Sequence, residues 1–430
     1  MNSRFFIKTY GCQMNVNDSE KMAGLLESRG WTQVYAERSA SLFIVNTCAV
    51  REKAQEKLFS YLGRLKRYKE LDPACTIVVA GCVSQLLKEE IRRRAPFVDL
   101  LLGTNAYPRL LEYLDQRGES NFRLSRHWNE VTSLHRRSSF SAFLSIMEGC
   151  DNFCSYCVVP FTRGREKSRP LSLILRELDE LSAQGYKEVV LLGQNVDAYL
   201  DPEKGGGFAD LLEVVAQRSG ASWIRFLTSH PSKFSLRIAE VMARNDKICR
   251  ALHLPFQAGS DRILSLMNRG YSKAEYLSLV KAIKERVPDI AMAADIIVGF
   301  PTEREEDFLE TMEIVEEVRF ENIFSFLYSP RPGTKSSKME DDVPPSVKGE
   351  RLIRLQERQK EIQLEENLKR IGSVQRVLLE ERNRKDPSQT VGRTAGGRVV
   401  NILGPCETGQ FADILIDGAG PHNLKGRIPL

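Results

Sequence analysis

Strand-like and helix-like segments alternate six times between residues 143 and 327 of this chain. The strand-like segments are short and apolar, and they cover residues 143–146, 189–192, 224–227, 252–254, 294–298 and 323–327. Helical patterns lie in the intervals, for example at residues 173–184, 208–218 and 273–286. Six strand–helix units in succession predict a partial (βα)6 barrel, in which the loops that follow the strands build the active site.

Each of the six strands runs directly into polar or glycine-containing sequence. The first is followed by Glu148, Gly149 and Cys150, and the second by Gly193 and Gln194. Polar residues after one strand are common in loops. Polar residues after all six strands favour a functional site, because a structural scaffold does not require polar residues at these positions.

The first third of the chain also alternates between strand and helix. Apolar strands at residues 5–10, 42–46 and 76–80 are separated by helical patterns, which predicts a parallel sheet covered on both faces. The first of these helices is expected to begin at the capping residues Asn17, Asp18 and Ser19 and to end at Gly30.

Three cysteines follow these strands. Cys12, Cys48 and Cys82 each lie just past a strand's carboxyl end, and such ends share one edge of a parallel sheet. We therefore expect the three thiols to converge on a metal cluster. The alternative is coincidence, since cysteines are often buried. The remaining cysteines occupy no equivalent position and are interpreted as small hydrophobic residues; they are Cys75, Cys249 and Cys406.

Three further thiols are crowded into eight residues at the end of the first barrel strand, as Cys150, Cys154 and Cys157. A structural zinc site has four protein ligands, and no fourth ligand is obvious nearby. A 4Fe-4S cluster held by only three thiolates leaves one iron with an open coordination position, as a catalytic metal site requires.

Length and composition fit an intracellular protein of several domains. The chain has 430 residues, an odd count of nine cysteines and a net charge of +5, which is too small to establish a polyanionic partner. It shows neither a membrane-spanning apolar run nor a signal peptide, so we expect a cytoplasmic protein that does not act at a membrane.

The C-terminal part changes character. A charged segment at residues 346–369 predicts a packing helix, and short alternating strands at residues 373–380, 390–394, 399–402 and 411–416 predict a small β-barrel. The expected fold class is therefore α/β, with an N-terminal parallel-sheet domain, a central partial barrel and a small C-terminal β-barrel. The expected domain boundaries are 1–117, a linker at 118–142, 143–365 and 366–430.

The spacing of the second cysteine triplet closely resembles that of the radical S-adenosylmethionine (SAM) enzymes. Together with the three N-terminal cysteines and the terminal β-domain, it resembles the methylthiotransferases, whose terminal module is called TRAM. The motifs YGCQMN at residues 10–15, NTCAVR at 46–51, SIMEGC at 145–150 and CVVPFTRG at 157–164 match the tRNA branch known as MiaB. The branch that acts on a ribosomal protein has a proline where Gln13 stands.

This resemblance implies a chemistry and its partners. Each cysteine triplet would hold one 4Fe-4S cluster, and two SAM molecules would be consumed, one as methyl donor and one as radical source. The acceptor would be carbon 2 of an isopentenylated adenosine beside the anticodon, in a tRNA anticodon stem-loop. An electron donor such as flavodoxin or ferredoxin and a donor of sulfur or clusters are the further partners implied.

The resemblance also suggests residues that bind SAM. Tyr156 matches the aromatic position expected against the adenine of SAM, with packing of the cysteine loop as the alternative. Gly193 and Gln194 stand where many radical enzymes have glycine and glutamate, and glutamine lacks the charge for an ion pair. Candidates at later strand ends are Gln257, Ser260 and Asp295, with hydrogen bonding to the backbone of the loops as the alternative.

Arginines near the second triplet and in the terminal β-domain are candidates for contacts with RNA phosphates. They are Arg163, Arg165 and Arg169, together with Arg393 and Arg398. The alternatives are a solvated helix end for the first group and a structural cap for the second.

Three functions therefore remain open. The first is a radical tRNA methylthiotransferase acting on isopentenyladenosine. The second is a non-catalytic metal-containing RNA-binding protein. The third keeps the radical chemistry and changes the acceptor to threonylcarbamoyladenosine in tRNA or to a ribosomal protein.

Overall fold

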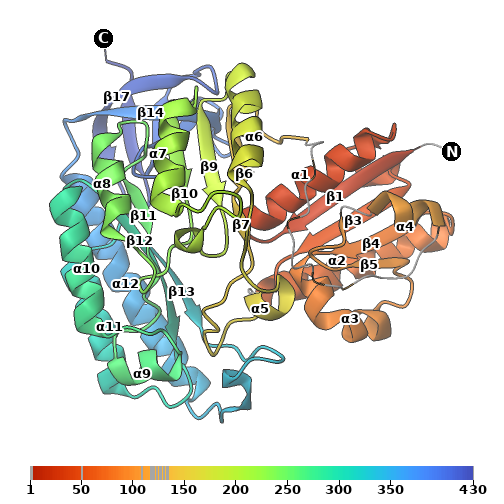
Figure 1. Ribbon diagram of the computed structural model, residues 1–430, viewed down its shortest axis with the longest axis horizontal. Coiled ribbons are helices and arrows are strands. Elements are labelled where there is room, and N and C mark those ends of the chain that lie inside the picture. The colour runs from red at the N-terminus through yellow and green to blue at the C-terminus, as the bar shows by residue number, and fades with distance from the viewer. Residues whose placement is uncertain are drawn as a thin grey trace.

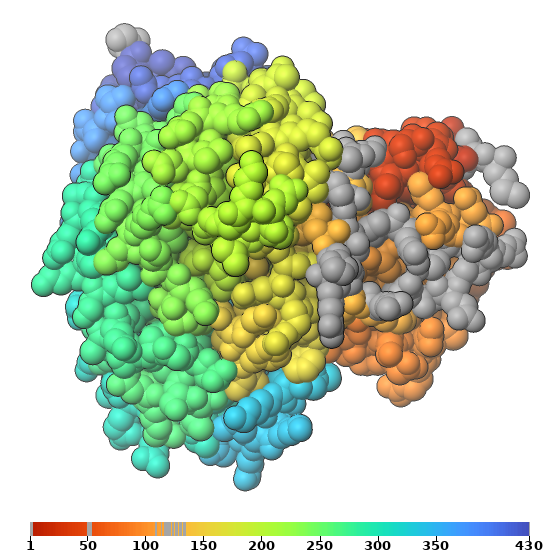
Figure 2. Space-filling model, in the orientation of Figure 1, coloured from red at the N-terminus to blue at the C-terminus, as the bar shows by residue number. Residues whose placement is uncertain are grey.

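The structure is a computed structural model, and it describes residues 3–49, 52–107, 110–116, 122, 124, 128, 131 and 135–429. Most of the expected linker at 118–142 lies outside the described residues. In Figure 1 the N-terminal α/β domain lies on the right of the central (βα)6 barrel. The small C-terminal β-barrel packs against the (βα)6 barrel at the upper left of the view. The space-filling view shows the red and orange N-terminal residues as a lobe of their own (Figure 2). Within the described residues, no helix is both long and apolar enough to cross a membrane.

The N-terminal domain is built on a five-stranded parallel sheet with the order β2-β1-β3-β4-β5. Its strands are β1 Arg4–Tyr10, β2 Thr32–Gln33, β3 Leu42–Thr47, β4 Thr76–Ala80 and β5 Leu100–Leu102. Its helices are α1 Gln13–Glu27, α2 Glu52–Leu71, α3 Cys82–Arg94 and α4 Leu110–Gln116, with a short 3-10 turn η1 at Glu37–Ser39. Separate apolar clusters cover the two faces of the sheet. The predicted parallel sheet is confirmed, although β2, β5 and α4 were too short to be predicted.

The start of α1 differs from the expectation. The helix begins at Gln13 with Cys12 as its N-cap, one turn before the predicted capping residues. Those residues are buried and make tertiary contacts instead: Asn17 Oδ1 accepts a 2.8 Å hydrogen bond from Ser145 Oγ, and Ser19 Oγ accepts one of 3.0 Å from Asn46 Nδ2. Asn17 and Ser19 are residue types that often cap helices, but in this protein they bond to neighbouring strands. The predicted start of the helix was wrong for this reason.

All six predicted barrel strands are present. They are β6 Ser141–Ser145, β9 Glu188–Leu192, β10 Trp223–Phe226, β11 Ala251–His253, β12 Ala291–Val298 and β13 Asn322–Leu327. Parallel pairing gives the orders β10-β9-β6 and β11-β12-β13, and a parallel bridge between Ile224 and Ile248 joins the halves. A short antiparallel ribbon, β7 Met147–Glu148 with β8 Lys167–Ser168, follows β6.

The helices of this domain lie mostly on the outside of the barrel, although the short α5 lies next to the N-terminal domain (Figure 1). They are α5 Val159–Thr162, α6 Leu171–Ala183, α7 Phe208–Arg218, α8 Leu236–Arg244, α9 Asp261–Leu266, α10 Lys273–Arg286, α11 Glu305–Val318 and α12 Pro345–Leu368, with 3-10 turns η3 Val196–Ala198 and η4 Ser336–Lys338. The predicted packing helix corresponds to α12, which buries Leu355 and Ile362 completely.

Side chains alternate along the last two barrel strands. In β12, Ile296 belongs to the buried core under the helices, whereas Asp295 and Ile297 point to the other face, the lumen. In the parallel register Asp295 lies beside Phe324 and Ile297 beside Phe326. Phe324 and Phe326 are 44% and 37% exposed, so the lumen is open along β13.

The C-terminal domain is a closed barrel with the order β14-β15-β16-β18-β17. Its strands are β14 Val374–Arg382, β15 Gln389–Thr394, β16 Val399–Leu403, β17 Phe411–Ala419 and β18 Leu424–Arg427. The predicted β-barrel is confirmed, and β18 is the strand that the sequence pattern did not reveal. The predicted boundary between residues 365 and 366 falls inside α12, and the exact domain boundaries stay predictions.

A buried charge network fixes the β-barrel to the (βα)6 barrel. Glu188 is fully buried in β9 and receives a 2.5 Å hydrogen bond from Arg225 Nε and one of 3.2 Å from Arg393 Nη2. The other guanidinium nitrogens of Arg225 donate to the carbonyls of Thr394 and Ala395. This network holds the two domains in one orientation, because Glu188 and Arg225 of the (βα)6 barrel are both hydrogen-bonded to residues of the β-barrel.

We expect Glu188→Gln to lower the free energy of unfolding by about 3–5 kcal/mol, because it leaves two guanidiniums at a buried interface without this counter-charge. Chemical denaturation monitored by the fluorescence of nearby Trp223 measures the effect. The matched control is Glu213→Gln, whose exposed ion pair with Arg237 is worth about 0–1 kcal/mol. Equal losses in both variants would contradict the assigned role of the network.

Candidate functional site

The three N-terminal cysteines meet at one edge of the sheet. Cys12 follows β1, Cys48 follows β3, and Cys82 is the first residue of α3 after β4. Cys12 and Cys48 are joined by a side-chain hydrogen bond, and Cys82 interacts electrostatically with Cys12. Gly11 makes this approach possible, because a Cβ there would lie 2.9 Å from Cys48 Cβ. The thiols therefore converge as expected, while their role as cluster ligands stays a prediction.

The surroundings of this triad lower the pKa of Cys12 and partly offset the effect of burial on Cys82. The hydrogen bond from Cys48, the nearby Arg163 guanidinium and the amides of Asn15 and Met14 lower the pKa of Cys12 to about 6. Burial raises the pKa of Cys82, and the charge and hydrogen bond of Arg163 oppose that effect. Cys12 and Cys82 also stand at helix N-termini, where the helix dipole stabilises an anion.

The second triad lies on the loop between β7 and α5. Burial raises the pKa of Cys150 to about 11 and that of Cys157 to about 12. Backbone amides face both sulfurs, since Asn152 donates to Cys150 and the Val159 amide lies 3.5 Å from Cys157 Sγ. Donors of this kind stabilise a thiolate or a metal-bound sulfur.

Contacts from the end of β9 and from the loop between α9 and α10 hold this loop in place. Gln194 Oε1 accepts a 2.7 Å hydrogen bond from the Gly149 amide, and Asn268 Nδ2 donates to the carbonyls of Asn152 and Phe153. Phe153 has a φ of +48°, which L-residues rarely adopt. Gln194 was predicted to bind SAM, and its side-chain oxygen is engaged with the cysteine loop. Gly193 is required by close packing, because a Cβ there would lie 2.5 Å from Met147 Cγ.

The other candidates for SAM binding differ in placement. Tyr156 packs beside a buried apolar cluster, and its hydroxyl is 3.4 Å from Arg269 Nη1. Gln257 is buried, and its main chain bonds to Asp295 and Ile297 of β12. Asp295 lies on the lumen face of β12, and its Oδ1 is 3.3 Å from His253 Nε2.

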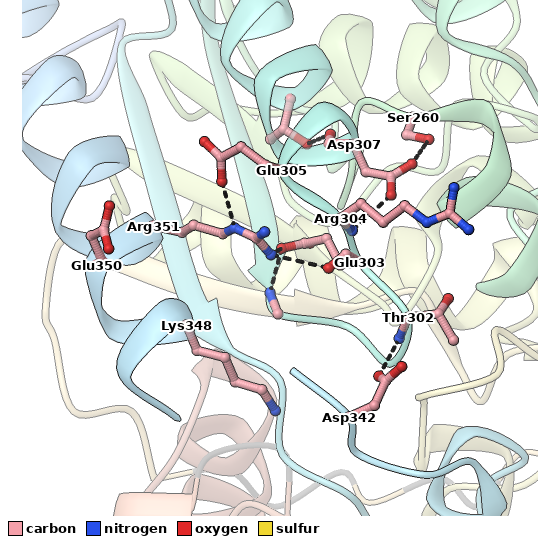
Figure 3. Close-up of polar contacts among 12 residues, drawn as sticks. Ser260, Thr302, Glu303, Arg304, Glu305, Asp307, Asp342, Lys348, Glu350 and Arg351 are labelled. Carbon is pink, nitrogen blue, oxygen red and sulfur yellow. Dashed lines mark hydrogen bonds and ion pairs between the residues drawn. The ribbon is translucent and has the colours of Figure 1, made fainter. Parts of the chain in front are cut away.

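Ser260 belongs to a hydrogen-bond network behind the loops, which Figure 3 shows. Its Oγ donates a 2.5 Å hydrogen bond to Asp307 Oδ1, whose carboxylate also accepts from the Arg304 amide. In the same view Arg351 reaches from α12 to Glu303 (Figure 3). The Glu303 carboxylate also accepts a hydrogen bond from the Gly299 amide. Ser260 is thus engaged with a carboxylate on α11, and its contact with SAM stays a prediction.

A residue with positive φ follows the carboxyl end of each of three successive barrel strands. Thr228, Gln257 and Thr302, which follow β10, β11 and β12, have φ values of +73°, +71° and +70°. Such conformations cost about 1–3 kcal/mol each and persist only where the surroundings impose them. Strain at this edge of the barrel supports a functional site there.

The predicted RNA contacts are mostly placed inside the molecule. Arg163 is 2% exposed and paired with Asp18, and Arg169 is buried against Glu177. Arg393 and Arg398 form ion pairs at the interface with the (βα)6 barrel. These four guanidiniums already have carboxylate partners, and Arg163 and Arg169 are too buried to meet a phosphate in this structure. RNA contacts of Arg393 and Arg398 stay predictions. The side chain of Arg165 is 66% exposed and stacks 4.8 Å from the ring centroid of Phe153.

The two triads border the same interface between domains. Val158, the residue after Cys157, packs in the apolar cluster that contains Cys82. Cys12 packs against Val190 and Leu192 of β9. Sequence reasoning did not identify this junction or Arg269, because residues distant along the chain form both.

The donor sets fit iron–sulfur clusters. Among the residues that the structure describes, no three His, Cys, Asp or Glu side chains are arranged to share one metal ion. A 4Fe-4S cluster does not need that arrangement, since each thiolate ligates a different iron. Each triad combines three thiols, backbone donors aimed at sulfur and a buried guanidinium next to them.

Three family matches cover most of the chain. Residues 4–103 match the uncharacterized protein family UPF0004, residues 144–315 the radical SAM superfamily, and residues 368–428 the TRAM domain. The chain is 46% identical to the tRNA-2-methylthio-N(6)-dimethylallyladenosine synthase of Acidovorax sp. (strain JS42), covering 100% of this chain and 98% of that relative. It is 45% identical to the enzyme of the same name from Nitrosomonas eutropha, covering 100% and 99%.

Solved structures share the fold. The radical SAM methyltransferase TsrM from Kitasatospora setae, solved with tryptophan and a SAM analogue, superimposes with a TM-score of 0.57 at 15% identity. The match covers 78% of this chain and 75% of that one.

The pKa of Cys12 is lowered whereas those of Cys150 and Cys157 are raised, which predicts different reactivity of these thiols in cluster-free protein. At about pH 7 Cys12, with its pKa near 6, is mostly thiolate and should react with iodoacetamide, whereas Cys150 and Cys157 stay protonated until the pH exceeds about 11. Peptide mass spectrometry across a pH series measures this. Cys249, whose burial raises its pKa to about 12, is the control outside both triads. Labelling of Cys12 only at alkaline pH would contradict the assignment.

Proposed function

This chain belongs to the MiaB family of radical SAM methylthiotransferases, and from that premise we propose that it adds a methylthio group to carbon 2 of N6-isopentenyladenosine beside the tRNA anticodon. Isopentenyl and dimethylallyl name the same substituent in this nucleoside. The observation that carries the proposal is the placement of two thiol triads on one domain junction, next to the barrel's strained strand ends.

The barrel triad would hold the 4Fe-4S cluster that the radical SAM family implies, with SAM at its open iron. When bound, cluster and SAM supply a carbon-centred radical that removes a hydrogen atom from the acceptor. The chain's own residues position this centre: Gln194 and Asn268 fix the cysteine loop, and Tyr156 is proposed to contact the adenine of SAM. Gly193 leaves room for Met147 beneath the loop.

The open lumen offers a place for the acceptor base. Phe324 and Phe326 expose aromatic surface on the lumen side of β13, and an adenine with an isopentenyl group is flat and apolar enough to pack there. His253 and Asp295 stand next to them and provide polar groups for the base edges. Gln257 positions Asp295 through main-chain hydrogen bonds.

The N-terminal triad would hold a second cluster, whose open iron carries the sulfur to be transferred. Support comes from the low pKa of Cys12 and from the helix N-termini at Cys12 and Cys82, both of which favour anionic sulfur. The second SAM would supply the methyl group. A donor of sulfur or clusters and an electron donor such as flavodoxin or ferredoxin are required by this chemistry.

Contact with the tRNA backbone is assigned to Arg165, whose side chain is exposed beside the cysteine loop. Its stacking on Phe153 combines a cation with an aromatic face, a combination that suits the phosphates and unstacked bases of an anticodon loop. Because the proposed substrate is a tRNA, we place the action of the protein in the cytoplasm.

The alternatives fit the observations less well. A non-catalytic RNA-binding protein would not require three strained residues at successive strand ends. Threonylcarbamoyladenosine or a ribosomal protein as acceptor keeps the same barrel chemistry, and the names of the relatives favour isopentenyladenosine.

Deletion of the gene is expected to leave isopentenyladenosine in tRNA without its methylthio group, because the modification at carbon 2 depends on this enzyme. Nucleoside mass spectrometry of tRNA from the deletion strain, with and without a plasmid copy, measures this. Accumulation of unmodified threonylcarbamoyladenosine would instead assign the alternative tRNA acceptor. An unchanged set of tRNA nucleosides would contradict both tRNA assignments.

The two triads should fail in different ways when one cysteine is removed. Cys157→Ala is expected to abolish formation of 5′-deoxyadenosine, whereas Cys48→Ala should retain it and lose thiolation. After anaerobic reconstitution the parent should contain about eight iron atoms and each variant about four, if each triad holds one 4Fe-4S cluster. Cys75→Ala, at a buried cysteine outside both triads, is the control. Identical behaviour of the Cys157 and Cys48 variants would refute the division of labour.

A further inference from the structure

Arg269 is a buried arginine that touches the barrel triad. It lies in the loop between α9 and α10 and is 4% exposed. Nη1 donates to Cys154 Sγ and to the Tyr156 hydroxyl, both at 3.4 Å. Nη2 donates to the Pro255 carbonyl at 2.6 Å, and Nε donates to the Tyr271 hydroxyl at 3.0 Å. All three guanidinium nitrogens are thus used inside the protein.

The partners of Arg269 carry no formal negative charge. They are a carbonyl, two phenols and a thiol, and no carboxylate in the described part of the chain forms an ion pair with it. Other buried arginines of this protein have such a partner, as Arg351 has Glu303 and Arg225 has Glu188. Burying an unpaired charge is costly, so a missing counter-charge next to Arg269 requires an explanation.

Among these partners, only Cys154 becomes anionic in the proposed function, because it would bind the cluster as a thiolate. A thiolate bound to an iron–sulfur cluster accepts hydrogen bonds, and such bonds help to set the reduction potential of the cluster. The geometry leaves one orientation for the guanidinium, because Pro255 and Tyr271 hold its other two nitrogens. The Tyr271 hydroxyl in turn donates to the Phe256 carbonyl, which connects Arg269 to the strand end after β11.

We propose that Arg269 is a positioning residue whose counter-charge is the anionic cluster held by Cys150, Cys154 and Cys157, and that its hydrogen bond to Cys154 raises the reduction potential of that cluster. This inference rests on the proposed function, because it needs a cluster at the barrel triad. Reduction adds an electron to an already anionic centre. A fixed cation in contact with one of its sulfur ligands stabilises the reduced state more than the oxidised state.

The test uses the full-length chain with Cys12, Cys48 and Cys82 replaced by alanine, so that only the barrel cluster reports. In a redox titration followed by electron paramagnetic resonance without SAM, Arg269→Met should move the midpoint potential to a more negative value. A tenfold change in the reduction equilibrium corresponds to 59 mV for one electron, and we expect at least that shift. Arg269→Lys keeps the charge and should stay closer to the parent potential.

Arg351→Met is the matched control, since it removes an equally buried arginine that has its carboxylate partner. It should lower thermal stability in cluster-free and reconstituted protein alike and leave the potential unchanged. Arg269→Met should leave the melting temperature of cluster-free protein unchanged or raise it, because it removes an unpaired buried cation. It should reduce the gain in melting temperature on reconstitution.

The outcomes separate this inference from the proposed function. A parent protein that takes up no iron at the barrel triad would refute the proposed function itself. An intact cluster with an unchanged potential in Arg269→Met would overturn the role of Arg269 alone. Loss of the cluster from a folded Arg269→Met variant, with retention in Arg269→Lys, would support the counter-charge role.

Discussion

The ion pair between Asp18 and Arg163 is the contact on which the arrangement of the two triads depends. Both side chains are 2% exposed, and the 2.5 Å hydrogen bond joins α1 of the N-terminal domain to the residue after α5 of the barrel. Arg163 also acts on Cys12 and Cys82 through its charge. The same guanidinium thus joins the two domains and acts on the thiols of the N-terminal triad. A buried charge is tolerated only where such partners surround it.

Buried charges recur at each junction of this protein. Glu188 with Arg225 and Arg393 fixes the C-terminal β-barrel, and Arg351 with Glu303 fixes α12 to the loop after β12. Buried pairs of this kind contribute little net stability, since desolvation offsets the attraction. What they provide here is a fixed relative position of domains, which a reaction between two separate sulfur sites and one base requires.

Much of the fold was predictable from the sequence, and the contacts at the site were less so. Short apolar runs identified all six barrel strands, because a strand that is buried on both faces is apolar along its whole length. The same reasoning missed β2 and β5, which have two and three residues and no periodicity to detect. It also took Asn17, Asp18 and Ser19 for helix caps, since a sequence does not show whether a polar side chain meets its own backbone or another domain.

The sequence by itself determined the two thiol triads, the order of the three domains and the family resemblance, because cysteine spacing and strand periodicity are local properties. Only the tertiary structure decided which of the arginines after the barrel triad are exposed. Arg163 and Arg169 follow the cysteine triplet as Arg165 does, yet two are buried with carboxylates from distant segments and one is exposed. Arg269, more than one hundred residues from Cys154 along the chain, donates a hydrogen bond to its sulfur in the folded structure. Burial and pairing arise from contacts between distant segments, and no local pattern records them.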